Sequence, residues 1–235
     1  MAFTIFINTD PIEAKRSSHV SWAQLREMKT HGATIANHTH YHSYLINLNS
    51  GRTSWKKSVI QEITHAQNII NKRLNQDIKL FAYPYGEFDE NSNKLLAELG
   101  YIGFGQQSGA IGRNSNLQSL PRFPASNKYG QFPIIETKLL STAFNDVEFK
   151  PAYGTINIKS ENPPKAVITG KPSLINNINC FGSSVGALNK AKISINSISV
   201  QSNSTFKTRR FRYNCTRKSS TTGRFSWVSI PWLNL

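Results

Sequence analysis

The first hundred residues alternate between short apolar runs and longer stretches in which apolar residues recur at helical spacing. Strands are predicted for the apolar and β-branched runs at residues 2–8, 33–37, 78–83 and 101–105. Helices are predicted between them, at residues 21–32, 53–75 and 89–99. Strands that alternate with helices indicate crossover connections and a parallel sheet. We therefore expect an α/β fold, either half of a doubly wound sheet or part of a (β/α) barrel.

The first of these helices has signals at both ends. Ser21 can cap its N-terminus, and Gln24, three residues later, completes a capping box. Gly32 offers a left-handed stop after the last turn.

From residue 151 the pattern changes to β-type runs separated by Pro, Gly, Asn and Ser, with no helical period. These runs are residues 155–160, 165–170, 193–200, 205–216 and 224–230. They predict a small antiparallel β domain, a sandwich. In the fourth run, Phe211, Tyr213 and Cys215 fall on one face, and the alternate positions, with two arginines and Asn214, fall on the other.

Charge also changes near residue 150. The chain has a net charge of +15, yet residues 1–150 contain 16 Lys/Arg and 12 Asp/Glu, whereas residues 151–235 contain 12 Lys/Arg and the single acid Glu161. This shift predicts one domain over residues 1–150 and a basic β-rich domain over residues 151–235. Such a basic surface suits an anionic partner such as an acidic glycan, a lipid headgroup or a nucleic acid. The alternative interpretation, a basic face that is only solvated, explains the charge equally well.

The sequence leaves the cellular compartment open. The opening "MAFTIFINTD" lacks the basic head and long apolar run of a signal peptide, and no stretch approaches the roughly 18 apolar residues of a membrane span. The two cysteines, Cys180 and Cys215, could pair in an exported protein or remain buried thiols in the cytoplasm.

Candidate chemistry gathers in "NHTHYH", directly after the second predicted strand. His38 and His42 are four residues apart, so in a helical turn their rings lie on one side and can bind one ion, whereas His40 points elsewhere. Imidazole suits zinc and several other transition metals, and a catalytic zinc has three protein ligands and a water. Because Tyr85 follows the third predicted strand, both groups should meet at the carboxyl end of the sheet, where α/β proteins place their sites.

These motifs resemble the polysaccharide deacetylases, the NodB-homology domain of carbohydrate esterase family four. "NHTHYH" is similar to the family's His-Ser/Thr-x-x-His motif, and "FAYPYGEFDENSNKLLAELGYIGFG" is similar to the segment that follows it, with residues 84–86 as its Pro-Tyr-Gly core. The resemblance covers about residues 2 to 125 and is nearest the subgroup that acts on poly-N-acetylglucosamine-like exopolysaccharides. It implies a distorted (β/α) barrel of the NodB-homology type.

The resemblance also implies roles for the matching residues. His38 and His42 would bind a divalent metal, with zinc expected, that activates water and polarises the acetyl carbonyl. The backbone N–H of Tyr85, beside Pro84, would complete an oxyanion site. Behind the ligands, the Thr39 hydroxyl would brace the histidine loop, and His40 would be a supporting or surface residue.

The chain departs from the family's pattern in three places. The Thr-Phe-Asp-Asp motif, which supplies the general base and a metal aspartate, has no counterpart. The arginine that often opens the third motif is Ala82, and no histidine follows His65 to act as general acid. These departures predict an N-terminally shortened, incomplete barrel that lacks its first strand and exposes a sheet edge.

Two residues could compensate for these departures. Asp10 lies just past the first predicted strand and could replace the lost carboxylate, although an ordinary Asx–Pro turn is the better explanation of "TDPIE". Arg122, in "LPRFP", could be an active-site arginine or a surface arginine between two prolines.

We therefore predict a metal-dependent hydrolase by descent, which removes acetyl groups from N-acetylated polysaccharide and has little activity in this shortened form. An intact relative would be periplasmic or secreted, which also fits a Cys180–Cys215 pair. The alternative is a non-catalytic protein whose basic segment binds an anionic glycan. Four aromatics of that segment could stack on sugar rings, or could equally be core residues: Phe211, Tyr213, Trp227 and Trp232. We expect no nucleic-acid partner, since only charge and aromatics point to one.

Overall fold

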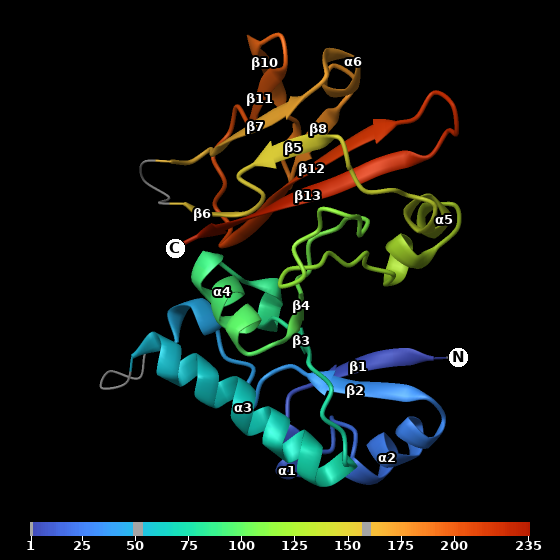
Figure 1. Cartoon of the computed structure of the whole chain (residues 1–235), viewed down its shortest axis with the longest axis vertical. Helices are drawn as coiled ribbons and strands as arrows, with labels where there is room; N and C mark the ends of the chain where they lie inside the picture. Colours follow the sequence, from blue (N-terminus) through green and yellow to red (C-terminus); the bar gives the residue numbers. More distant parts are fainter. Residues whose placement is uncertain (1, 49–53, 157–160) are drawn as a thin grey trace. The chain divides into compact units, whose positions relative to one another are not determined.

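The computed structural model describes residues 2–48, 54–156 and 161–235, which form two compact units (Figure 1). Unit 1 consists of residues 1–105 and 116–120, and unit 2 consists of residues 106–115 and 121–235. This division lies earlier in the chain than the predicted boundary at residue 150. The reason is strand pairing, because β5 (Val147–Lys150) is hydrogen-bonded to β7 (Lys165–Gly170) and so belongs to the β-rich unit.

Unit 1 contains a four-stranded parallel sheet in the order β1-β2-β3-β4. The strands are β1 (Phe3–Ile7), β2 (Ala33–Asn37), β3 (Leu80–Ala82) and β4 (Ile102–Phe104). All four predicted strands are confirmed, although β3 and β4 are shorter than the apolar runs that contain them. In the described part of the chain the sheet is open, and its closure into a barrel stays a prediction.

The helices of unit 1 lie where the periodicity places them, with a few short additions. They are α1 (Asp10–Glu13), α2 (Trp22–Thr30), η1 (Leu45–Asn47), α3 (Trp55–Leu74), η2 (Pro84–Gly86) and α4 (Glu90–Glu98). The capping box of Ser21 and Gln24 is present, and Gly32 has a φ of +90°. Ser54 caps α3, and the predicted start at Thr53 lies outside the described residues.

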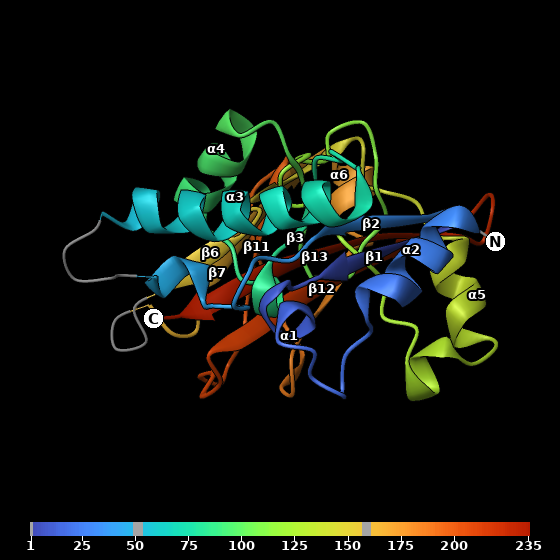
Figure 2. The ribbon, with the colours of Figure 1, turned by 90° about the horizontal axis from the view of Figure 1, so that it is seen from below.

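Helices α2 and α3 bury their apolar sides against one face of the sheet. Ile35 of β2, Leu25 of α2 and Ile70 of α3 are fully buried in a shared cluster. Figure 2 shows α3 running alongside β1 and β2. Burial of such side chains contributes roughly 1.5–3 kcal/mol each, so this packing holds β2, which leads into the histidine loop, in place. Among the described residues, no helix is long and apolar enough to cross a membrane.

Unit 2 is a sandwich of two sheets. One has the order β10-β11-β7-β5 and the other β6-β13-β12-β8-β9. The further elements are η3 (Asn127–Gly130), α5 (Ile134–Leu139), β6 (Gly154–Ile156), α6 (Pro172–Ile175), β8 (Asn179–Gly182), β9 (Gly186–Ala187), β10 (Asn189–Ser194), β11 (Ser197–Gln201), β12 (Arg210–Lys218) and β13 (Phe225–Asn234). The predicted, mostly antiparallel sheets are thus present, and a separate domain with the bounds 151–235 stays a prediction.

Some details of unit 2 differ from the sequence-based expectation. Residues 193–200 are not a single strand: they include the turn of a hairpin, with Ile195 and Asn196 between β10 and β11, and the chain reverses there next to the polar Ser194, Asn196 and Ser197. The pairing is not wholly antiparallel, since β6 runs parallel to β13. A short helix, α6, occurs where no helical period was expected, and residues 157–160 of the first predicted run lie outside the described residues.

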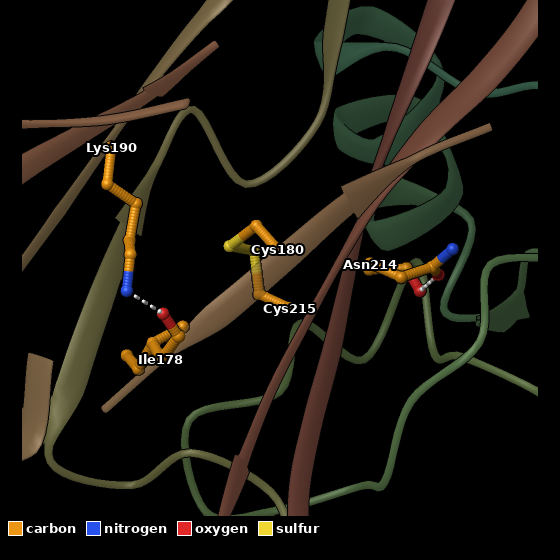
Figure 3. The surroundings of a disulfide bond; sticks show 6 residues. Ile178, Cys180, Lys190, Asn214 and Cys215 are labelled. Carbon is orange, nitrogen blue, oxygen red and sulfur yellow. Dashed lines mark hydrogen bonds between the residues drawn. A yellow bond between two sulfur atoms is a disulfide. The ribbon is translucent and has the colours of Figure 1, made fainter. Parts of the chain in front are cut away.

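Alternation along β12 decides which of its side chains enter the core. Phe211, Tyr213 and Cys215 are buried there, as their spacing predicts. Cys180 of β8 lies opposite Cys215 and is bonded to it in a disulfide (Figure 3). The same view shows Lys190 donating a hydrogen bond to the carbonyl of Ile178. The cysteines therefore join neighbouring strands of one sheet.

Candidate metal centre and active site

The histidine loop begins where β2 ends, and Asn37 anchors it there. The Asn37 Oδ1 accepts a hydrogen bond of 2.8 Å from the N–H of Thr39, and this bond forms an Asx turn. Its Nδ2 donates at 2.9 Å to the carbonyl of Ile63 in α3. Asn37 is completely buried, so this amide fixes the first residues of the loop against the longest helix of unit 1.

The loop turns through two left-handed residues rather than through the helical turn that the spacing suggested. Thr39 has a φ of 70° and His42 a φ of 60°, which is uncommon for residues other than glycine. The buried Thr39 Oγ1 accepts a hydrogen bond of 3.0 Å from the N–H of His42 and holds this turn. The predicted bracing role of Thr39 thus has a geometric basis. Left-handed backbone of this kind tends to occur at functional sites.

This turn brings the rings of His38 and His42 together. Their Nε2 atoms lie 3.1 Å apart, and the rings meet edge to face with centroids 4.7 Å apart. The Nδ1 of His38 lies 2.6 Å from the carbonyl of Ala82, at the end of β3. Because a carbonyl only accepts, the Nδ1 of His38 is a donor, and the Nε2 of the same ring faces His42.

The arrangement fits a shared metal ion. Two metal–nitrogen bonds of about 2.0–2.1 Å, meeting near the tetrahedral angle, place the nitrogens about 3.3 Å apart. The observed separation of 3.1 Å is close to this value. The contact from His38 to a backbone carbonyl is the usual outer contact of a metal-binding histidine. Burial lowers the pKa of His42 and so favours the neutral ring that a metal ligand requires.

Tyr85 lies directly beside this pair. Its ring centroid is 4.6 Å from that of His42, and the ring also stacks in parallel on Tyr44, with centroids 4.1 Å apart. Tyr85 has a φ of 59°, within the short helix η2 that starts at the buried Pro84. The tight turn is closed by a hydrogen bond of 2.9 Å from the N–H of Gly86 to the carbonyl of Tyr83. The structure thus brings the predicted Pro-Tyr-Gly motif and the histidine pair together.

His40 points away from the pair, as its spacing predicts, and it is buried rather than on the surface. Its Nδ1 lies 2.8 Å from the hydroxyl of Thr9, and its ring meets that of His65 at 4.4 Å. Burial, and secondly the neighbouring His65, lower the pKa of His40. The carbonyl of His40 also accepts a hydrogen bond of 3.1 Å from the N–H of Asp10. His40 therefore ties the loop to the end of β1.

The side chain of Asp10 is engaged elsewhere. Its carboxylate pairs with Arg16 at 3.2 Å, and Asp10 opens the short helix α1, with Pro11 in the first turn. In residues 2–48, 54–156 and 161–235, no group of three or more His, Cys, Asp or Glu side chains could together hold a metal ion. The structure therefore does not bring Asp10 to the two histidines as a third ligand.

Glu62 is a site residue that the sequence reading missed. Its carboxylate, on the buried side of α3, accepts hydrogen bonds of 3.1 Å from the N–H groups of both His40 and Tyr41. A signal was present, because Glu62 is three residues after Val59 and four before Ala66 and so falls within the apolar stripe of α3. An acid at such a position indicates a buried hydrogen-bonding role.

Arg122 belongs to unit 2 and is partly buried. Its N–H donates to the carbonyl of Gln107 at 2.9 Å, and burial lowers the pKa of its guanidinium. Neither of the two sequence readings of Arg122 is tested by these contacts, so its catalytic role stays a prediction.

The aromatic residues of the basic segment do not form an exposed platform. Phe211, Tyr213 and Trp232 belong to the buried core of unit 2, and the partly buried Trp227 packs edge to face on Phe123 at 5.2 Å. Of the two alternatives, the core position is confirmed for these three residues, because alternation along β12 and β13 turns their side chains inward, and stacking on a glycan is wrong for them.

The N-terminal part of the chain is similar to known proteins. Residues 1–104 match the family model for polysaccharide deacetylase. The similarity to polysaccharide deacetylases thus extends over nearly all of the first segment of unit 1. The chain is also 28% identical over 127 residues to the "Putative polysaccharide deacetylase YxkH" of Bacillus subtilis (strain 168), a match that covers 54% of this chain and 43% of that protein. The chain thus matches less than half the length of this curated relative.

Two solved structures of deacetylases are similar to part of this chain. The Streptococcus pyogenes deacetylase PplD, in complex with acetate, is 25% identical with a TM-score of 0.47, covering 51% of this chain and 50% of its own. The BpsB deacetylase domain from Bordetella bronchiseptica is 19% identical with a TM-score of 0.44, covering 51% of this chain and 59% of its own.

Proposed function

We propose that unit 1 is a polysaccharide deacetylase domain and that its metal-dependent site removes acetyl groups from N-acetylated polysaccharide. The observation that carries the proposal is the 3.1 Å separation of the Nε2 atoms of His38 and His42. In support, the pair lies beside Tyr85 at the carboxyl ends of neighbouring strands, within residues that match the family model for polysaccharide deacetylase. Imidazole ligands suit zinc as well as several other transition metals, and zinc is the ion we propose.

Each residue would contribute in a different way. His38 and His42 would hold the ion, which when bound supplies Lewis-acid polarisation of an acetyl carbonyl and an activated water. The N–H of Tyr85, held by the left-handed turn at Pro84, would stabilise the oxyanion that develops on that carbonyl. The stacked rings of Tyr85 and Tyr44 would form a flat apolar wall beside the ion for the acetyl methyl group.

We expect slow turnover from the chain as given. The described residues bring no carboxylate into a three-ligand group with the histidine pair, and the sequence has no histidine after His65 to serve as a late general acid. The same observation favours the second candidate function, a non-catalytic glycan-binding protein. We further propose that the protein acts outside the cytoplasm, because the buried Cys180–Cys215 disulfide is typical of oxidising compartments.

Zinc titration by calorimetry tests the proposed site. Wild type should bind one ion, and His38→Ala and His42→Ala should each weaken binding by at least about tenfold, since each removes one of two ligands. His19→Ala is the matched control, because His19 is exposed and lies outside the loop. His40→Ala should weaken binding much less than either ligand variant. Wild-type affinity in both His38→Ala and His42→Ala would refute the assignment.

A further inference from the structure

Exposed apolar side chains gather around one short helix of unit 2. Five large hydrophobic residues within twelve positions of the chain are exposed, which we call the α5 patch: Tyr129 (46%), Phe132 (77%), Ile134 (42%), Leu139 (74%) and Leu140 (49%). Single exposed hydrophobic residues are normal on a protein surface, but a local concentration of this kind marks an interaction site.

Two cations hold the backbone of this segment in place. The buried Lys138 donates from its Nζ to the carbonyls of Pro124 (2.6 Å) and Tyr129 (2.9 Å). Arg224 donates from its Nε to the carbonyl of Leu140 at 2.5 Å. The apolar side chains therefore protrude from a segment whose backbone is held by hydrogen bonds. Binding through them does not incur the entropic cost of ordering a flexible loop.

The charge around the patch restricts its partner. Unit 2 contains 17 Lys/Arg and 4 Asp/Glu, and Glu136 is the only acid between residues 121 and 145. Exposed Lys128 lies 5.3 Å over the Tyr129 ring at one end of the patch, and exposed Arg224 lies at the other. Such a surface attracts an anionic partner, and it repels a second copy of the same basic chain.

The side chains of the patch indicate which class of anionic partner, a lipid surface or a glycan, fits it. Sugar rings stack on aromatic faces, but Ile134, Leu139 and Leu140 are aliphatic and offer no such face. Aliphatic and aromatic tips flanked by cations are the composition that enters the boundary between headgroups and acyl chains. We propose that the α5 patch docks unit 2 on an anionic lipid surface, with Phe132 and Leu139 inserted below the headgroups.

Flotation with lipid vesicles tests this proposal on the full chain. Wild type should float with vesicles of equimolar phosphatidylglycerol and phosphatidylcholine, and much less with phosphatidylcholine alone. The double variant Phe132→Ser/Leu139→Ser should bind the anionic vesicles at least about tenfold more weakly, because it loses two large apolar groups. The matched control is Ile195→Ser, which removes a residue that is 70% exposed in the β10–β11 turn, drawn well apart from α5 in Figure 1. This control should bind like wild type.

A second measurement distinguishes insertion from adsorption by charge alone. An environment-sensitive dye on Phe132→Cys should shift to the blue on anionic vesicles, whereas the same dye on Ile195→Cys should not. Circular dichroism and the thermal midpoint should be unchanged in all variants, since the replaced side chains are exposed. The proposal is overturned if the double variant floats like wild type, if phosphatidylcholine alone binds wild type equally, or if no vesicle binds. A wild-type dimer that the double variant dissolves, without vesicle binding, would assign the patch to a second copy instead.

Discussion

The carboxylate of Glu62 in α3 accepts a 3.1 Å hydrogen bond from the N–H of His40, at the centre of the histidine loop. The same oxygen also accepts from the N–H of Tyr41. A buried acid thus satisfies two consecutive backbone donors of the loop that carries both proposed metal ligands. The shape of the site therefore depends on a residue that is itself no metal ligand in our proposal.

Glu62→Ala should destabilise unit 1 by about 2–3 kcal/mol, because the buried N–H of His40 and the partly buried N–H of Tyr41 lose a charged acceptor. Urea denaturation measures the loss. Glu62→Gln keeps one acceptor oxygen and should lose less, and Gln61→Ala, at an exposed position of the same helix, is the control and should lose little. A loss in Glu62→Ala no greater than in Gln61→Ala would show that these hydrogen bonds do not stabilise the loop.

Acetate release from a poly-N-acetylglucosamine oligomer should be slow in the chain as given. A positioned general base alone is worth about 10²–10⁴ in rate, and the described residues bring no carboxylate into a three-ligand group with His38 and His42. The measurement is acetate produced with zinc present, compared with His42→Ala. Rapid release that Asp10→Asn abolishes would show instead that Asp10 moves from Arg16 to the site.

Much of unit 1 could be predicted because its signals are local. The capping box of Ser21 and Gln24 and the stripe of α3 each depend on neighbours within a few residues, and both are present in the structure. The position of His38 could be predicted only in part. Its spacing from His42 indicates that the rings can meet, but the left-handed turn that brings them together depends on Thr39 and Asn37.

Contacts between distant segments were the least predictable features. The hydrogen bond from His38 to Ala82 joins two strands that are 44 residues apart, and no local pattern specifies it. In unit 2, charge marked residue 150 as a boundary, yet strand pairing and not charge decides which segments pack together. The inward face of β12 was predictable from alternation. That prediction, however, also implied that Phe211 and Tyr213 could not serve as an exposed platform.

Reduction of the Cys180–Cys215 disulfide should destabilise unit 2. The bridge closes a loop with a sequence separation of 35 residues, for which the loss of chain entropy in the unfolded state amounts to about 3–4 kcal/mol. Urea denaturation with and without reductant measures this, and hydrogen exchange should locate the loss in β8 and β12. The double variant Cys180→Ala/Cys215→Ala, insensitive to reductant, is the control. An unchanged midpoint on reduction of wild type would contradict the prediction.

Acid should weaken the contact that ties α1 to α3. The Glu13 carboxylate accepts hydrogen bonds from Arg73 at 2.9 and 3.0 Å and from the Trp22 indole at 2.6 Å, and its pKa is lowered, chiefly by the hydrogen bond from Arg73. A carboxyl group with a lowered folded-state pKa stabilises the fold above its unfolded pKa of about 4.3, and this contribution disappears as the pH falls through the folded value. Wild type should therefore be more stable than Glu13→Gln near neutral pH and lose that advantage in acid. Urea denaturation across a pH series measures the difference, with Glu27→Gln as the control at an exposed acid. An advantage over Glu13→Gln that persists at the acid end of the series would show that the contact does not depend on the charge of Glu13.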